Sequence, residues 1–155
     1  MPEPLRVVLD TQIVLDLLHF ADPQTACLRV SIGSGALRCF SDQPCFGELE
    51  RVVGYPQFSL DTNARRTLLQ TYHALLTYCE APGDERLVLP RCRDQDDQKF
   101  LQLAARCRAD LLLSRDRRLL RLAGDRRLPF AIVDAKTAGR WLSAAADSTD
   151  HHVSP

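Results

Sequence analysis

The sequence predicts an α/β fold, a three-layer α/β/α sandwich with a central, mainly parallel sheet. Short apolar runs alternate with longer segments of helical periodicity along the chain, which is the order of strand–helix–strand units. The apolar runs show little polar alternation, as in strands covered on both faces. Right-handed crossovers between such strands place helices on both faces of the sheet.

Four apolar runs are expected to be strands, and a fifth run is a short extended segment. The strands are residues 5–9, 36–40, 111–113 and 130–133, and the extended segment is 87–89. The first, LRVVL, is expected to be central because nearly all of its residues are apolar.

Helices are expected between these runs, and capping residues indicate several of their ends. They cover about 11–19, a stretch from Pro23 to the Gly-Ser-Gly at 33–35, 43–53, 62–79, 94–105, 119–122 and 135–145. Asp42 is a candidate N-cap, Gly54 closes the same helix, and the Pro-Gly pair at 82–83 ends the longest one.

The length and composition indicate one globular domain. The chain has 155 residues and a formal net charge of zero, so any nucleic-acid contact needs a local basic patch. We expect a domain at 1–146 and a polar, disordered tail at 147–155. The N-terminus does not resemble a signal peptide, no apolar run approaches the ~20 residues of a membrane span, and the six cysteines form no zinc motif. A cytoplasmic protein with reduced thiols is therefore expected.

Acidic residues follow two of the expected central strands. Asp10 comes directly after the first strand, and Asp116 follows the 111–113 strand. Ligand sites in parallel sheets form at the carboxyl ends of strands. An aspartate at such a place is also a common helix N-cap, and each of the two alone fits that alternative.

Two further acids lie on helices that open toward the same edge of the sheet. Asp97 is in the first turn of the helix before the 111–113 strand, where capping and the helix dipole also favour acids. Asp96 competes with Asp97 for the role of third acid, and the helical register favours Asp97. Glu48 lies on the helix after the second strand, and periodicity does not decide whether Glu48 or Glu50 faces inward.

The segments VVLDTQIVLDLL, CFGELERVVGYPQF and RDQDDQKFLQLAARCRADLLLSRDRRLLRL together resemble PIN-domain proteins, in particular the VapC-like ribonucleases that are toxin components of toxin–antitoxin systems. The resemblance extends from residue 5 to about 142. It implies that Asp10, Glu48, Asp97 and Asp116 are catalytic metal ligands. The family usually has Asn where this chain has Gln12 and Thr where it has Ser114. Further candidates for an auxiliary role beside the four acids are Thr11, Gln12, Asp96 and Ser114.

The implied activity is hydrolysis of RNA with Mg²⁺ or Mn²⁺, which suits ligands that offer only oxygen. In this interpretation the ions activate a water molecule, position the phosphate and stabilise the leaving oxygen. Glu48 either orients the water or completes a second metal site. All but two of the twenty basic residues are arginine. Arg115, Arg117 and Arg118, beside the fourth acid, are candidate RNA contacts, with a solvated helix face as the alternative. A homodimer and a small antitoxin partner are implied by the family alone.

Three other interpretations fit parts of the sequence. A haloacid-dehalogenase phosphatase needs a second Asp two residues after the first, where Gln12 stands. A receiver domain needs a lysine near its last strand, and neither Lys99 nor Lys136 fits. A non-catalytic PIN fold that binds RNA or a protein partner is compatible with the sequence, and Gln12 keeps that alternative open.

Overall fold

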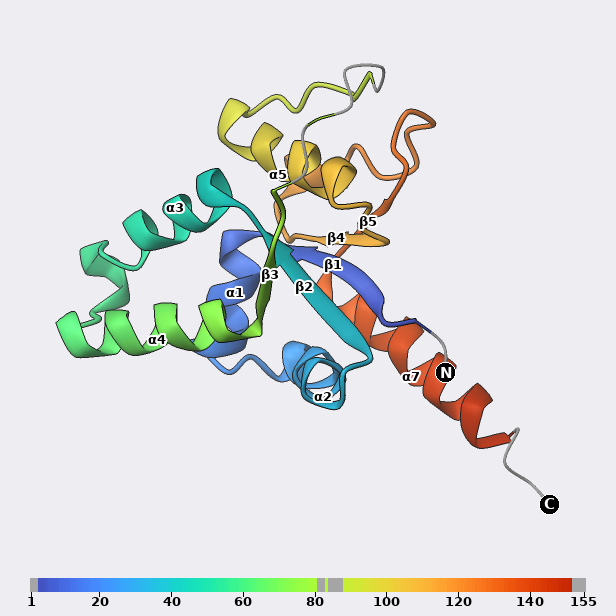
Figure 1. Ribbon diagram of the computed structural model, residues 1–155, viewed down its shortest axis with the longest axis horizontal. Coiled ribbons are helices and arrows are strands. Elements are labelled where there is room, and N and C mark those ends of the chain that lie inside the picture. The colour runs from blue at the N-terminus through green and yellow to red at the C-terminus, as the bar shows by residue number, and fades with distance from the viewer. Residues whose placement is uncertain (1–2, 81–82, 84–87, 152–155) are drawn as a thin grey trace.

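The computed structural model describes residues 3–80, 83 and 88–151, and the side chains up to residue 145. It contains a five-stranded, entirely parallel sheet with the strand order β3-β2-β1-β4-β5. The strands are β1 (Leu5–Leu9), β2 (Leu37–Ser41), β3 (Leu76–Tyr78), β4 (Leu111–Leu113) and β5 (Ala131–Val133). The predicted α/β/α sandwich is confirmed, and β1 is the central strand (Figure 1).

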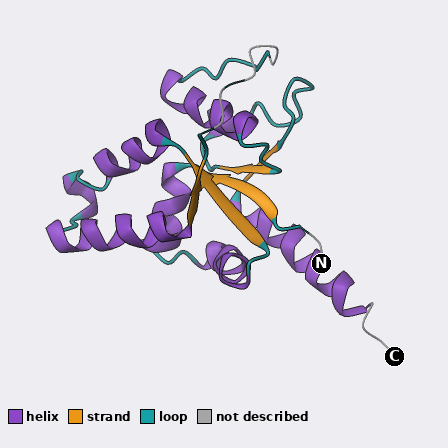
Figure 2. Cartoon of the chain, viewed as in Figure 1, coloured by secondary structure: helices purple, strands orange, loops and turns teal. Residues whose placement is uncertain are grey.

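Helices connect the strands and form the two outer layers (Figure 2). They are α1 (Thr11–Leu18), α2 (Ala26–Ser34), α3 (Gln43–Val52), α4 (Thr62–Leu75), α5 (Gln95–Arg106), α6 (Arg117–Leu120) and α7 (Ala135–His151). Two 3₁₀ turns, Pro23–Thr25 and Pro56–Phe58, precede α2 and α4. Among the described residues, no helix is long and apolar enough to cross a membrane.

The pleat of the sheet divides the core in two, because successive strand residues point to opposite faces. Val7 and Leu9 of β1 pack in the larger cluster with α1, α2, α4 and α7. Val8 packs in the smaller cluster, which is formed mainly with α5 and α6. Figure 1 accordingly shows α5 on one side of the sheet and α1, α2 and α7 on the other.

Aspartates and one glycine set the helix ends. The side chains of Asp42, Asp61 and Asp94 accept hydrogen bonds from backbone N–H groups in the first turns of α3, α4 and α5. These bonds satisfy donors that have no partner within the helix. Gly35 ends α2 with φ of 84°, a conformation that glycine adopts without steric cost.

One strand differs from the sequence-based expectation. The fourth helix was expected to continue to Cys79, but it ends at Leu75, and Leu76–Tyr78 forms the edge strand β3 beside β2. Periodicity fails here because three half-buried residues fit either a helix or a strand. Of the expected extended segment at 87–89, Leu87 lies outside the described residues, and Val88 and Leu89 belong to no strand.

The last helix is longer than expected. It continues to His151, past the predicted helix end at 145 and past the predicted domain boundary at 146. Residues 152–155 lie outside the described residues, so the disorder of the tail stays a prediction. All six cysteines are free thiols, and Cys39, Cys45, Cys92 and Cys107 are buried.

Candidate active site

A pocket of about 470 Å³ opens where β1 and β4 end. Its lining consists of Asp10, Thr11, Gln12, Glu48, Val52, Asp97, Arg115 and Asp116. The fold therefore brings four acidic side chains from α3, α5 and the ends of two neighbouring strands into one pocket. We call this space the acid pocket.

Asp10 occupies the N-cap position of α1, but its side chain makes no capping hydrogen bond. One carboxylate oxygen instead accepts a hydrogen bond from Ser114 Oγ at 2.7 Å. Asp10 is only 7% exposed. Burial, reinforced by the negative charges of Glu48 and Asp116, raises its pKa to about 6, although the Ser114 bond acts in the opposite direction. The capping alternative therefore does not account for this carboxylate.

Ser114 links the two strand ends. Its hydroxyl donates to Asp10, and the same oxygen accepts the backbone N–H of Asp116 at 3.0 Å. Asp116 also caps α6, because its carboxylate accepts the backbone N–H of Arg118 at 2.8 Å. One oxygen of Asp116 thus has a structural role, while the side chain still lines the acid pocket.

Asp97 is the buried acid of the α5 N-terminus, and Asp96 is exposed to solvent. The Oδ2 atom of Asp97 is buried and has no hydrogen-bond partner among the described residues. Burial, together with the negative charges of Asp10, Asp116 and Asp94, raises the pKa of Asp97 to about 7. A buried oxygen without a donor is costly, so this atom needs either a proton or a cation.

Glu48 differs from the other acids because it has strong partners. Lys99 Nζ donates to Glu48 Oε1 at 2.9 Å, and Thr11 Oγ1 donates to Oε2. Both members of the Lys99–Glu48 ion pair are less than one fifth exposed. Glu48 therefore enters the pocket with its charge balanced and its orientation fixed.

A second polar network holds the opposite wall of the pocket. Asp16 on α1 is buried, and its Oδ1 accepts from Gln12 Nε2 at 3.2 Å. Arg115 Nε lies 3.3 Å from Asp16 Oδ2, so the guanidinium is held at the pocket lining. Of the other arginine candidates, Arg118 pairs with Asp94 at 2.9 Å, and Arg117 is exposed. Neither of these two lines the pocket.

Residues 6–118 match the family model of the PIN domain. The chain belongs to the PIN domain family. The match covers well over half of the sequence and includes every strand except β5. No curated protein matches the chain. PIN domains are generally nucleases, which is the class of activity that the family assignment supports.

Nucleases of the PIN domain family usually use divalent metal ions, and the acids of this chain fit such ions in part. The candidate ligand atoms are carboxylate oxygens, which Mg²⁺ and Mn²⁺ prefer. Asp97 Oδ2, which no described residue contacts with a hydrogen bond, is an available ligand. Within the described residues, however, no three His, Cys, Asp or Glu side chains converge closely enough to form a ready-made metal centre. Mutual repulsion between uncompensated carboxylates opposes such convergence.

Sequence reasoning missed Lys99 and Asp16. Lys99 is one of only two lysines in this arginine-rich chain and lies two residues after Asp97. Asp16 is the one charged residue inside the apolar segment IVLDLL, four residues after Gln12. An acid on the buried face of a helix needs a polar partner, and that requirement was the available signal.

Proposed function

We propose that this protein is a metal-dependent endoribonuclease with Asp10, Glu48, Asp97 and Asp116 as its catalytic residues. The observation that carries the proposal is the acid pocket, in which Asp97 Oδ2 has no hydrogen-bond partner among the described residues and burial raises the pKa of Asp10 and of Asp97. A bound Mg²⁺ or Mn²⁺ would give the Asp97 oxygen a partner and would stabilise the ionised forms of both aspartates. Residues 1–146 would form the nuclease domain.

Asp10, Asp97 and Asp116 are the residues that would hold the metal. A divalent ion held there would supply charge neutralisation at the phosphate and would lower the pKa of a bound water molecule. Glu48, fixed by Thr11 and Lys99, would present an immobilised carboxylate that can orient a water molecule in the pocket. We assign auxiliary roles to Thr11 and to Ser114, which hold acids in place.

Arg115 is the basic residue with the best position for substrate. Its side chain lies at the pocket lining with Nε turned to Asp16, and more than half of it is exposed. The remaining N–H groups are then available to a phosphate, which a guanidinium binds through two parallel hydrogen bonds. Arg117 and Arg118 are proposed as outer contacts to the RNA backbone, and Gln12 as a support for Asp16.

The decisive experiment is cleavage of mixed-sequence single-stranded RNA with Mg²⁺ or Mn²⁺. We expect wild type to cleave, and Asp10→Asn and Asp116→Asn to lose at least a hundredfold in rate, as expected for loss of a metal ligand. Asp96→Asn is the matched control because Asp96 is an exposed neighbour on the same helix turn as Asp97. Metal-binding wild type that leaves all RNA intact would contradict a general ribonuclease.

A non-catalytic PIN-fold module is the second candidate function. The ion pair between Lys99 and Glu48 favours it, because a lysine already occupies the neighbourhood of one of the four acids. The absence of a ready-made metal centre among the described residues agrees with this candidate. Calorimetry with Mn²⁺ separates the two, because a module without metal affinity gives no heat of binding.

We also propose that the nuclease is the cytoplasmic toxin of a toxin–antitoxin pair. The sequence resemblance to VapC-like proteins supports this role, which includes a small antitoxin partner and a homodimer. Growth arrest on induction, relieved by Asp10→Asn, would support the toxin role, and unimpaired growth with active enzyme would favour RNA processing. Sedimentation at micromolar concentration tests the dimer.

A further inference from the structure

A second pocket lies beside the acid pocket, between the start of α3 and the outer face of α5. Its volume is about 550 Å³, within the range typical of small-ligand sites. Its lining includes Asp42 and Pro44 from the β2–α3 junction, and Gln98, Lys99, Gln102 and Arg106 from α5. Arg91 and Leu89 close one end. We call this space the basic pocket.

The two pockets are separated by one ion pair. Lys99 lines the basic pocket and Glu48 lines the acid pocket, and their charged atoms are 2.9 Å apart. Helices α3 and α5 contribute to both linings. A ligand that occupied the basic pocket would therefore lie next to any group held by the four acids.

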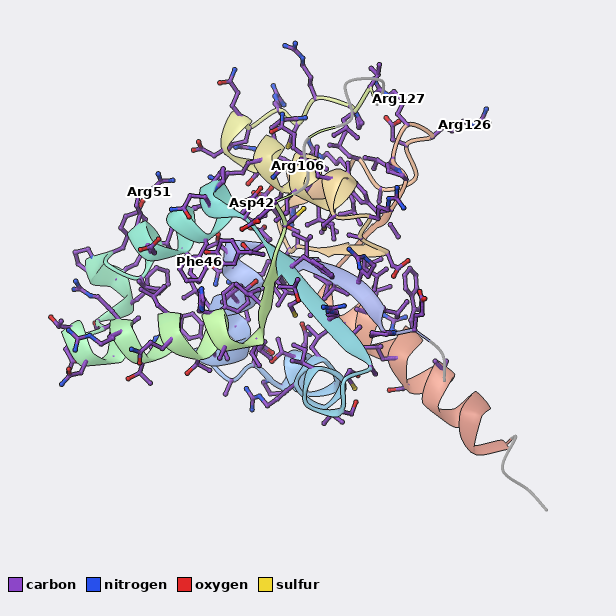
Figure 3. The ribbon with its side chains drawn as sticks, viewed as in Figure 1. Asp42, Phe46, Arg51, Arg106, Arg126 and Arg127 are labelled. Carbon is purple, nitrogen blue, oxygen red and sulfur yellow. The ribbon has the colours of Figure 1, made fainter. Side chains whose placement is uncertain are left out.

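The described lining of the basic pocket has more cationic than anionic side chains, and it has N–H donors left for a ligand. Among the described lining residues, the cations are Arg91, Lys99 and Arg106 and the carboxylate is Asp42. Asp42 already accepts from Arg106 Nη2, and Lys99 is paired with Glu48 of the acid pocket. Figure 3 shows Asp42 and Arg106 next to each other at this junction. Arg106 Nε is buried and has no hydrogen-bond partner among the described residues. Lys99 uses one of its three N–H donors on Glu48.

The same pocket also has an apolar part. Pro44, Leu89 and Ala105 contribute to the lining beside the cations. A simple phosphate would use only the charged part. A nucleotide presents a phosphate to cations and a base to apolar carbon, so it matches both parts.

On the basis of the proposed function, we infer that the basic pocket binds one nucleotide of the RNA strand, adjacent to the nucleotide whose phosphate lies at the acid pocket. Arg106 and Arg91 contact its phosphate, and the pocket's apolar part contacts its base. Asp42 orients Arg106 and is a positioning residue. The Lys99–Glu48 pair separates the two neighbouring subsites.

The test measures binding of a short, fluorescently labelled single-stranded RNA by anisotropy in EDTA, where no cleavage occurs. The variants are Arg91→Ala and Gln102→Glu, both at exposed positions of the basic pocket. Arg66→Ala and Gln70→Glu, at exposed positions of α4, make the same chemical changes elsewhere. We expect affinity to fall about three- to tenfold in the pocket variants and to stay unchanged in the α4 variants. The slope of log affinity against log salt should fall by about 0.7 for Arg91→Ala, as for one lost phosphate contact to a single strand.

Competition identifies the ligand class. A nucleoside 5′-monophosphate should displace the labelled RNA from wild type at concentrations where inorganic phosphate does not. Equal displacement by the two would overturn the nucleotide assignment, and so would pocket variants that bind RNA as wild type does. The experiment distinguishes failure of this inference from failure of the proposed function. If wild type binds RNA through the basic pocket but cleaves none with Mg²⁺, the nucleotide subsite stands and only the proposed nuclease activity is refuted.

Discussion

Replacement of Asp10 by asparagine is expected to stabilise the metal-free protein while it abolishes cleavage. Burial holds the Asp10 pKa at about 6 in the folded protein, against an ordinary value of 3.8. The folded state therefore binds this proton more tightly than the unfolded state, and stability falls as the pH rises between these two values. The asparagine keeps an oxygen that can accept the Ser114 hydroxyl. It carries no charge that burial would penalise.

The size of the effect follows from the two pKa values. The cost of ionising Asp10 in the folded state is about 3 kcal/mol at pH 7.5 and about 1 kcal/mol at pH 4.5. Asp10→Asn should gain stability by nearly these amounts in EDTA. Urea unfolding at the two pH values measures the gain from the midpoint, provided that the slope m is unchanged.

Exposed Asp96 supplies the control for this experiment. Asp96→Asn removes a carboxylate from the same region without removing a buried charge, so we expect a change within about 0.5 kcal/mol at both pH values. An Asp10→Asn variant that is no more stable than wild type at pH 7.5 would refute the reasoning. Such a result would mean that the Asp10 charge is already compensated without metal.

Three further predictions concern metal, capping and packing. Mg²⁺ should raise the melting temperature more at pH 7.5 than at pH 4.5. Asp10 and Asp97, with pKa values raised to about 6 and about 7, must lose their protons to bind the ion. An equal increase at both pH values would exclude these two residues as ligands. Asp42→Ala should lower the free energy of unfolding by about 2–4 kcal/mol, because α3 loses its N-cap and Arg106 loses its carboxylate partner. Urea unfolding of this variant beside Arg106→Met separates the two causes. Leu112→Ala should lower the free energy of unfolding by about 2–5 kcal/mol, since Leu112 is fully buried in the core under α5. If calorimetry shows that the free energy of unfolding falls by less than about 1 kcal/mol, the core around this position repacks.

Much of the fold could be predicted from the sequence because its strands are strongly patterned. The runs LRVVL and LLL are apolar at every position except Arg6, and the structure has them as β1 and β4 at the expected bounds. Strand β3 could not be predicted, because only its pairing with β2 distinguishes LTY from one more helical turn. Such pairing depends on residues far away in the sequence.

The candidate site could likewise be predicted only in part. Its acids could be expected to gather because parallel strands end at one edge of the sheet, and all four line one pocket. The partners of those acids could not be predicted. Whether Lys99 reaches Glu48, and whether Gln12 turns to Asp16, depends on side-chain directions and on the packing of α1, α3 and α5. Periodicity does not contain that information.

The hydrogen bond from Ser114 to Asp10 joins the ends of β4 and β1, so the geometry of the site depends on the correct pairing of these strands. Strand β4 has only three residues, and its pairing with β1 places Leu113 opposite Leu9. Ser114 and Asp10 come directly after that pair and are joined by a 2.7 Å hydrogen bond. A shift of β4 by one residue would pair Asp110 with Val7 or Ser114 with Leu9, inside the core, and would also break this bond. A chain that misaligns these strands thus loses the acid pocket together with the packing of its core, so a misfolded copy would lack the four gathered acids.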